Sequence, residues 1–162
     1  MRLIHGSSTA LAMMFVAVAC CVPGGSVAQT SQKSDVEAVR AANDAFYAAL
    51  SSRDSAAIQK VWSKDADIQN IGPRSKTIDV GWAEHKKAYD ATFDAFPELK
   101  VSMDEPRIKV NGSTAWVSGI EKAERRTKAG QFGKGTNLGT SIFVKQGGRW
   151  LMVYHHASAI PQ

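Results

Sequence analysis

The chain has little cysteine: Cys20 and Cys21 are its two thiols in 162 residues. Both lie in an N-terminal segment with the pattern of a cleaved signal, and once that segment is removed no thiol is left for a disulfide, a cysteine metal site or a cysteine nucleophile. The chain also lacks the apolar run of about 20 residues that spans a bilayer. It has no glycine-rich phosphate loop before a helix and no nucleophile elbow around a serine. We therefore expect a domain without cofactor that has no stable membrane association after signal cleavage.

The first residues have the pattern of a secretory signal. Arg2 is followed by an apolar run over residues 9–22, a break at Pro23, and the small residues Ser26-Val27-Ala28. This pattern predicts a signal peptide over residues 1–28 and a periplasmic or secreted protein. A lipoprotein attached through Cys20, which follows Ala17-Val18-Ala19, is the alternative.

The remaining 134 residues (162 − 28) are enough for one ordinary core. Without Arg2 they carry 19 basic and 15 acidic residues, a net charge of +4. The clearest basic cluster surrounds one glycine-containing loop: Lys122, Arg125, Arg126, Lys128 and Lys134. Because only Phe132 interleaves with these charges, the cluster is typical of a solvated hairpin tip, and we expect no nucleic-acid partner.

Helices are predicted in the first half of this domain, residues 34–162. Residues 29–33 are interpreted as a polar, disordered leader. Ser34 to Glu37 has the form of a capping box, and an apolar stripe then runs to about Ser52. Asp54 can cap a short second helix, and a third begins at Gly81 or Trp82 and ends at Pro97.

Strands follow the helices. A first strand over 65–71 ends at the Gly72-Pro73 turn, and strands over 99–103, 107–110, 114–127, 136–145 and 149–159 come after the third helix. Asn111-Gly112 and Gly147-Gly148 are hairpin signals. The sequence thus predicts an α+β domain with three helices packed on one face of a curved antiparallel sheet.

The last strand has two apolar faces. With a period of two, Val153 and His155 share one face, while Trp150, Met152 and Tyr154 share the other. An apolar patch formed by that second face and by Trp116 and Ile120 on a neighbouring strand favours a homodimer through the convex side of the sheet.

Several motifs follow one another in a characteristic order: Phe46-Tyr47-Ala48-Ala49-Leu50 before Asp54, Val61-Trp62-Ser63-Lys64-Asp65, Gly81-Trp82, Asn111-Gly112 and Trp150…His156-x-Ser158. In this order and spacing the chain resembles the NTF2-like superfamily. The chain is most similar to the SnoaL-like, ketosteroid-isomerase-like branch. The resemblance implies a cone-shaped barrel with a pocket between helices and sheet, and commonly a dimer, but not one activity.

Ketosteroid isomerases use a carboxylate base and an oxyanion hole made of a tyrosine and a protonated aspartate. Alignment through the motifs places Phe46 at the tyrosine, Asn70 at the base and Ser141 near the aspartate. Phenylalanine donates no hydrogen bond and asparagine is a poor base, so steroid-type isomerisation is not expected.

The same alignment turns polar residues of four strands into one pocket. Glu121 and His155 form a candidate acid/base couple there. The candidate ligand-binding residues are Phe46, Asn70, Trp82, Tyr89, Val117, Asn137, Ser141, Phe143 and Val153. We expect no metal, since no ligand spacing stands out. Binding of a small apolar or amphipathic molecule is the favoured function, and an isomerase, cyclase or hydratase acting on a carbonyl substrate is the alternative.

Overall fold

The computed structural model describes residues 25–161, with side chains from residue 31 onward. Residues 1–24, with both cysteines and most of the predicted signal peptide, lie outside the described residues. Signal cleavage and the lipoprotein alternative therefore stay predictions. Within the described part of the chain, no helix has the length and apolarity needed to cross a membrane.

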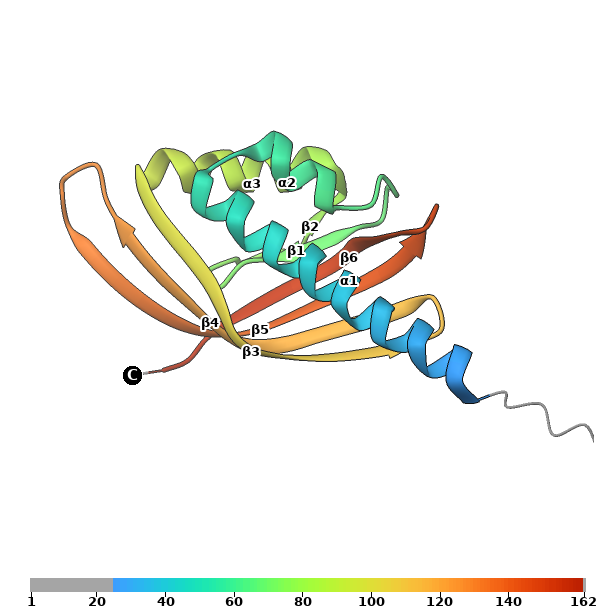
Figure 1. Cartoon of the computed structure of the whole chain (residues 1–162). Coiled ribbons are helices and arrows are strands. Elements are labelled where there is room, and N and C mark those ends of the chain that lie inside the picture. Colours follow the sequence, from blue (N-terminus) through green and yellow to red (C-terminus); the bar gives the residue numbers. More distant parts are fainter. Residues whose placement is uncertain (1–24, 162) are drawn as a thin grey trace, which may run out of the picture.

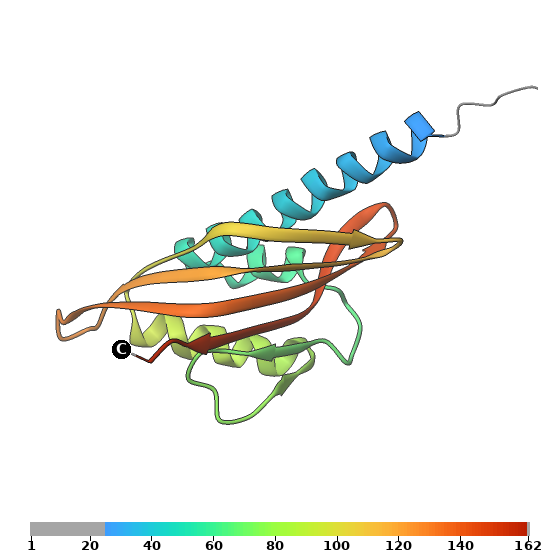
Figure 2. The same cartoon turned by 90° about the horizontal axis from the view of Figure 1, so that it is seen from below.

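Three helices lie on the concave side of one curved sheet (Figure 1). The helices are α1 (Gly25–Ser52), α2 (Ser55–Val61) and α3 (Gly81–Ala95). The strands are β1 (Gln69–Ile71), β2 (Asp79–Val80), β3 (Glu98–Asn111), β4 (Thr114–Arg126), β5 (Phe132–Gln146) and β6 (Arg149–Ala159). Within residues 25–161, no helix covers the convex side, as the view from below shows (Figure 2).

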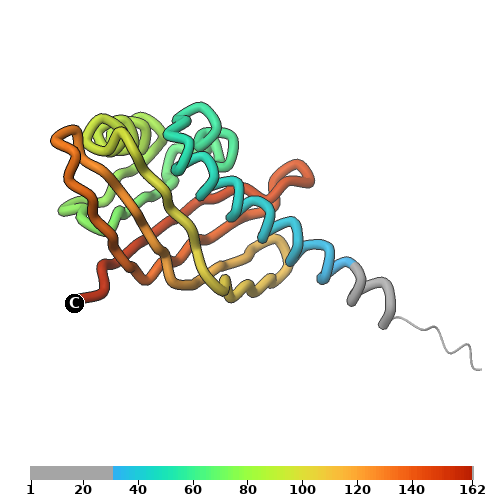
Figure 3. Tube along the Cα trace, turned by 60° about the vertical axis from the view of Figure 1, so that its left-hand side comes forward, coloured from blue at the N-terminus to red at the C-terminus, as the bar shows by residue number. Residues whose placement is uncertain are grey.

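The sheet has six strands in the order β2-β1-β6-β5-β4-β3. Its pairs are antiparallel except β1 with β6, which is parallel, so the sheet is mixed and does not close. The predicted α+β cone-like fold is confirmed, with the parallel pair and the short strand β2 as additions. Long, strongly bent hairpins form the rest of the sheet (Figure 3).

Helix α1 packs a narrow apolar stripe against the sheet. Val39, Phe46 and Ala49 are buried on it at helical spacing, and Trp62, Phe143 and Met152 complete the core beneath. The second helix begins as expected, because the Asp54 carboxylate accepts from the Ala57 amide at 2.9 Å.

The start of α1 differs from the sequence prediction. The helix begins at Gly25, so residues 29–33 are helical rather than a disordered leader, and the Ser34–Glu37 segment lies inside the helix. Alanine, glutamine and lysine in this stretch are good helix formers. Within this segment the Asp35 carboxylate accepts hydrogen bonds from Lys145 Nζ at 2.6 Å and from Trp150 Nε1 at 3.1 Å, which join α1 to β5 and β6.

A β-bulge in β6 changes which residues of the last strand share a face. Ile142 pairs with Tyr154, but the next residue, Phe143, pairs with Met152, which leaves Val153 as an extra residue. The bulge shifts the alternation by one position, so Trp150 and Met152 are buried under α1. The prediction that they form a convex dimer patch is wrong.

Candidate functional site

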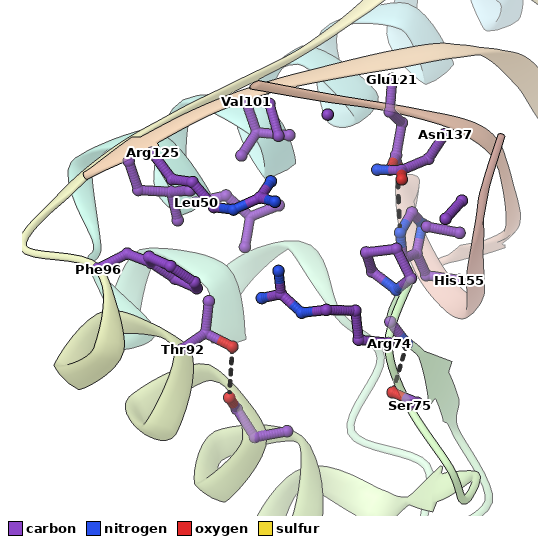
Figure 4. Close-up of a pocket in the computed structure, with 18 of the residues that line it drawn as sticks. Leu50, Arg74, Ser75, Thr92, Phe96, Val101, Glu121, Arg125, Asn137 and His155 are labelled. Carbon is purple, nitrogen blue, oxygen red and sulfur yellow. Dashed lines mark hydrogen bonds and ion pairs between the residues drawn. The ribbon is translucent and has the colours of Figure 1, made fainter. Parts of the chain in front are cut away.

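A cavity of about 600 Å³ lies between α3, the end of α1 and the concave sheet. Its apolar lining includes Phe46 and Leu50 from α1, Phe96 after α3, and Leu99 and Val101 from β3. Two groups of charged side chains line it, one around Glu121 and one around Arg74 and Arg125 (Figure 4), and further polar side chains lie on the wall nearest α3. The cavity therefore has a deep polar end, an apolar middle and a basic mouth.

Glu121 is the centre of the deep end. It points inward from β4 and is 3% exposed. Its side chain lies across Gly139 on the neighbouring strand β5, where a Cβ would sit 2.7 Å from Glu121 Cγ. Glycine at position 139 is thus what lets this carboxylate cross the strand.

Three side chains hold the Glu121 carboxylate. The Tyr47 hydroxyl donates to Oε1 at 2.6 Å, and the Asn137 amide donates to Oε2 at 3.4 Å. His155 Nε2 lies 3.3 Å from Oε1. A buried carboxylate needs such partners, because an unpaired charge away from water is strongly unfavourable.

These partners set the ionisation of the site. Burial raises the pKa of Glu121, but hydrogen bonds from His155, Tyr47 and Asn137 outweigh it, and the net pKa is below the usual value. Burial and the adjacent Glu121 charge raise the pKa of Tyr47. Glu121 is therefore an anion at neutral pH, and Tyr47 is a neutral hydrogen-bond donor.

His155 connects the carboxylate to a serine. With Nε2–H facing Glu121, its Nδ1 accepts from the Ser141 hydroxyl at 3.0 Å, and the Phe46 ring packs against the imidazole at 4.9 Å between centroids. This tautomer is the one that satisfies both contacts. Ser141 has no exposed surface and does not line the cavity, so it orients the imidazole and is not placed as a nucleophile.

A second polar group lines the wall nearest α3. The Tyr89 hydroxyl donates to Asn70 Oδ1, and Asn70 Nδ2 donates to Asp79 Oδ2, each at 3.3 Å. Behind it, His85 Nε2 lies 3.1 Å from the Asp79 carbonyl oxygen, and burial lowers the pKa of this imidazole. Burial likewise raises the pKa of Tyr89.

The structure brings together six of the residues expected in the pocket. Lining the cavity are Phe46, Asn70, Tyr89, Glu121, Asn137 and His155. The other five are placed elsewhere. Val117, Ser141 and Phe143 are fully buried beneath the site, Trp82 packs beside the His85 and Tyr89 rings, and Val153, at the bulge, lines a separate depression with Tyr154.

Sequence reasoning missed two parts of the site. Alignment placed Phe46 at the tyrosine position of the isomerases, yet the next residue, Tyr47, brings a phenol to Glu121. The signal available in the sequence was a tyrosine directly beside Phe46 in the apolar stripe of the first helix. The basic mouth was hidden because Arg125 was grouped with the solvated hairpin tip. Among the described residues, no cluster of three or more His, Cys, Asp or Glu could hold a metal ion.

Comparison with known proteins identifies the fold family. The family model described as "SnoaL-like domain" matches residues 39–162. A search of the curated proteins gives no match.

Solved structures give the same fold. An NTF2-like family protein from Streptomyces avermitilis is 23% identical over 80% of this chain and 99% of its own, with a TM-score of 0.73. An NTF2-like superfamily protein from Salmonella enterica is 18% identical over 83% and 94%, with a TM-score of 0.71. A ketosteroid isomerase-like protein from Erwinia carotovora atroseptica is 19% identical over 79% and 98%, with a TM-score of 0.68. The chain belongs to the SnoaL-like domain family and has the NTF2-like fold.

Proposed function

We propose that this protein binds a small amphipathic molecule in the cavity between α3 and the sheet. The observation that supports it most is the cavity itself, about 600 Å³ with an apolar middle and a few convergent polar groups. Pockets of this size and lining are typical of sites for small molecules. Phe46, Leu50 and Val101 would contact the apolar body, and the Asn137 amide would orient a polar group.

Binding is favoured over catalysis because the polar groups of the deep end are satisfied by one another. Both His155 nitrogens have partners, and Glu121 Oε1 is shared by Tyr47 and His155. A carboxylate whose pKa lies below the usual value is a weak base for a carbon-bound proton.

Binding can be tested with the neutral dye N-phenyl-1-naphthylamine, whose fluorescence rises in an apolar site. Thr92 on α3 lines the cavity, so Thr92→Trp fills it, whereas Ala91→Trp adds the same side chain on the exposed face of the same helix. We expect saturable binding that weakens about tenfold or more in Thr92→Trp and is unchanged in Ala91→Trp. Equal binding by the three proteins would place the dye elsewhere and contradict the proposal.

One contact favours a second candidate function. His155 Nε2 and Glu121 Oε1 lie 3.3 Å apart, and both residues line the cavity, so the imidazole N–H holds Glu121 in place as an ionised base. Oε2 is held only by Asn137, at 3.4 Å, and is the atom able to accept a proton from carbon beside a substrate carbonyl. Returning that proton to another carbon would give an isomerase-type reaction. Turnover of a carbonyl substrate that is lost in Glu121→Gln, with dye binding unchanged, would support it.

We also propose that two copies associate through the convex face. Trp116, Ile142 and Tyr154 are paired side by side across β4, β5 and β6, and Trp116 and Leu138 are 42% and 57% exposed there. A two-fold axis would place this apolar row against its own copy. Sedimentation should give a dimer that Trp116→Glu dissociates and Ala91→Glu leaves intact. A monomeric native protein would contradict this.

Export remains a proposal based on residues 1–28. The intact mass of the protein purified from its own host should lack these residues. A mass that retains them would overturn the proposal, and a lipid adduct on Cys20 would show that the lipoprotein alternative is right.

A further inference from the structure

The mouth of the cavity carries two arginines that no carboxylate neutralises. Arg74 comes from the loop after β1 and Arg125 from the end of β4, and both line the cavity. Figure 4 shows both guanidinium groups on the cavity side, near Phe96. Within residues 31–161, whose side chains are described, neither arginine forms an ion pair.

Their basic neighbours differ in this respect. Lys134 pairs with Glu124 at 2.7 Å, Arg126 with Glu98 at 3.0 Å, and Lys128 with Asp94 at 2.5 Å. These three carboxylates are therefore bound by other cations. Since like charges repel, two arginines that face one space with no carboxylate at ion-pair distance from either form an unfavourable arrangement, which an anionic ligand would relieve.

The surrounding residues hold both arginines in place. The Phe96 ring lies under both guanidinium groups, 5.1 Å from Arg74 Cζ and 5.6 Å from Arg125 Cζ. Arg125 also lies over two glycines of β5: a Cβ at Gly135 would be 3.0 Å from its Nη1, and one at Gly133 would be 3.8 Å from its Nε. Burial and the Arg125 charge lower the pKa of Arg74, in keeping with their proximity.

We propose that Arg74 and Arg125 bind the carboxylate of the ligand, which is an amphipathic monocarboxylic acid; this rests on the function proposed above. Planar guanidinium groups match a planar carboxylate through paired hydrogen bonds. The opposite orientation is disfavoured, because the deep end already holds the buried carboxylate of Glu121 and lies next to Asp79.

The rest of the cavity limits the other parts of the ligand. Leu50, Leu99 and Val101 line the middle, so the body next to the carboxylate is apolar. The far end meets the Asn137 amide, which suits a neutral hydroxyl or carbonyl group. The class is thus a fatty or aromatic acid, with or without an oxygen substituent distant from the acid.

Calorimetric titration with octanoate, octan-1-ol and octyl phosphate tests this, since the three share one apolar body. We expect the Kd of octanoate to be at least about tenfold lower than that of octanol, a difference in binding free energy of about 1.4 kcal/mol. Its affinity should fall as ionic strength rises, and that of octanol should not. Tighter binding of octyl phosphate than of octanoate would overturn the choice of a carboxylate.

Arginine variants locate the effect. Arg74→Gln with Arg125→Gln should remove the preference for octanoate, whereas Arg126→Gln, one residue along β4 and paired with Glu98, should keep it. If octanol binds and octanoate has no advantage, this inference fails while the proposed function stands. If no ligand binds, or Thr92→Trp blocks none of them, the proposed function fails, and this inference fails with it.

Discussion

The two ends of the cavity solve the problem of burying polar groups in different ways. At the deep end, Glu121 is 3% exposed and is held by Tyr47, Asn137 and His155. At the mouth, Arg74 and Arg125 lie over the same Phe96 ring, and neither forms an ion pair with a described side chain. At the deep end the chain itself supplies the partners of the buried charge, whereas at the mouth a ligand would supply them. Substitutions at the deep end should therefore affect mainly stability, and those at the mouth mainly binding.

The largest effect is expected at Glu121. Glu121→Ala leaves the Tyr47 hydroxyl and His155 without their buried partner, and removing one member of such a pair costs about 3–5 kcal/mol. Glu121→Gln keeps an oxygen for Tyr47 and should cost about 1–2 kcal/mol. Urea unfolding measures both variants. Equal losses would mean that the hydrogen-bond network does not stabilise the deep end.

A smaller loss is expected where Glu121 crosses β5. Gly139→Ala places a methyl group 2.7 Å from Glu121 Cγ, and the overpacking should lower the free energy of unfolding by about 1–3 kcal/mol. Gly133→Ala is the control on the same strand, because its methyl group would meet Arg125 at an ordinary 3.8 Å. Similar effects in the two variants would contradict the close approach at Gly139.

The deep end should also depend on pH. Because the folded-state pKa of Glu121 lies below the usual value, its ionised form stabilises the fold above the unfolded pKa of about 4.3. That contribution is lost as pH falls from there through the folded pKa. The stability difference between the native protein and Glu121→Gln should thus be constant near pH 7 and shrink on acidification. A difference that grew on acidification would reverse the assigned direction.

The smallest effect on stability is expected at the mouth. Arg74→Gln and Arg125→Gln remove charges without ion-pair partners, so the free energy of unfolding should change by no more than about 0.5 kcal/mol. Thermal and urea unfolding of each single variant measure this. A loss as large as that of Glu121→Ala would show that the mouth, like the deep end, stabilises the fold.

How much of the site the sequence could predict depended on how regular the strands are. Glu121, Asn137 and His155 all line the cavity, and their common side could be predicted because period-two alternation depends only on counting residues. Counting fails where an extra residue enters a strand, and so Trp150 and Met152 were assigned to the wrong face. Arg125 escaped notice since Arg126 and Lys128, its neighbours in the same basic cluster, are indeed ion-paired at the surface.

The bulge at Val153 has a consequence for how β6 can vary. Before it, Trp150 and Met152 face α1, and after it, His155 and Ala157 face the cavity. A single unpaired residue thus divides one strand into a structural half and a ligand-facing half with opposite alternation. The two halves can change independently, so a new specificity can be selected at His155 and Ala157 without repacking the interior under α1. Deleting Val153 would place Tyr154 directly after Met152, so that Trp150, Met152, His155 and Ala157 would share one face by plain period-two alternation, and the strand would lose only the local bend and twist of the bulge.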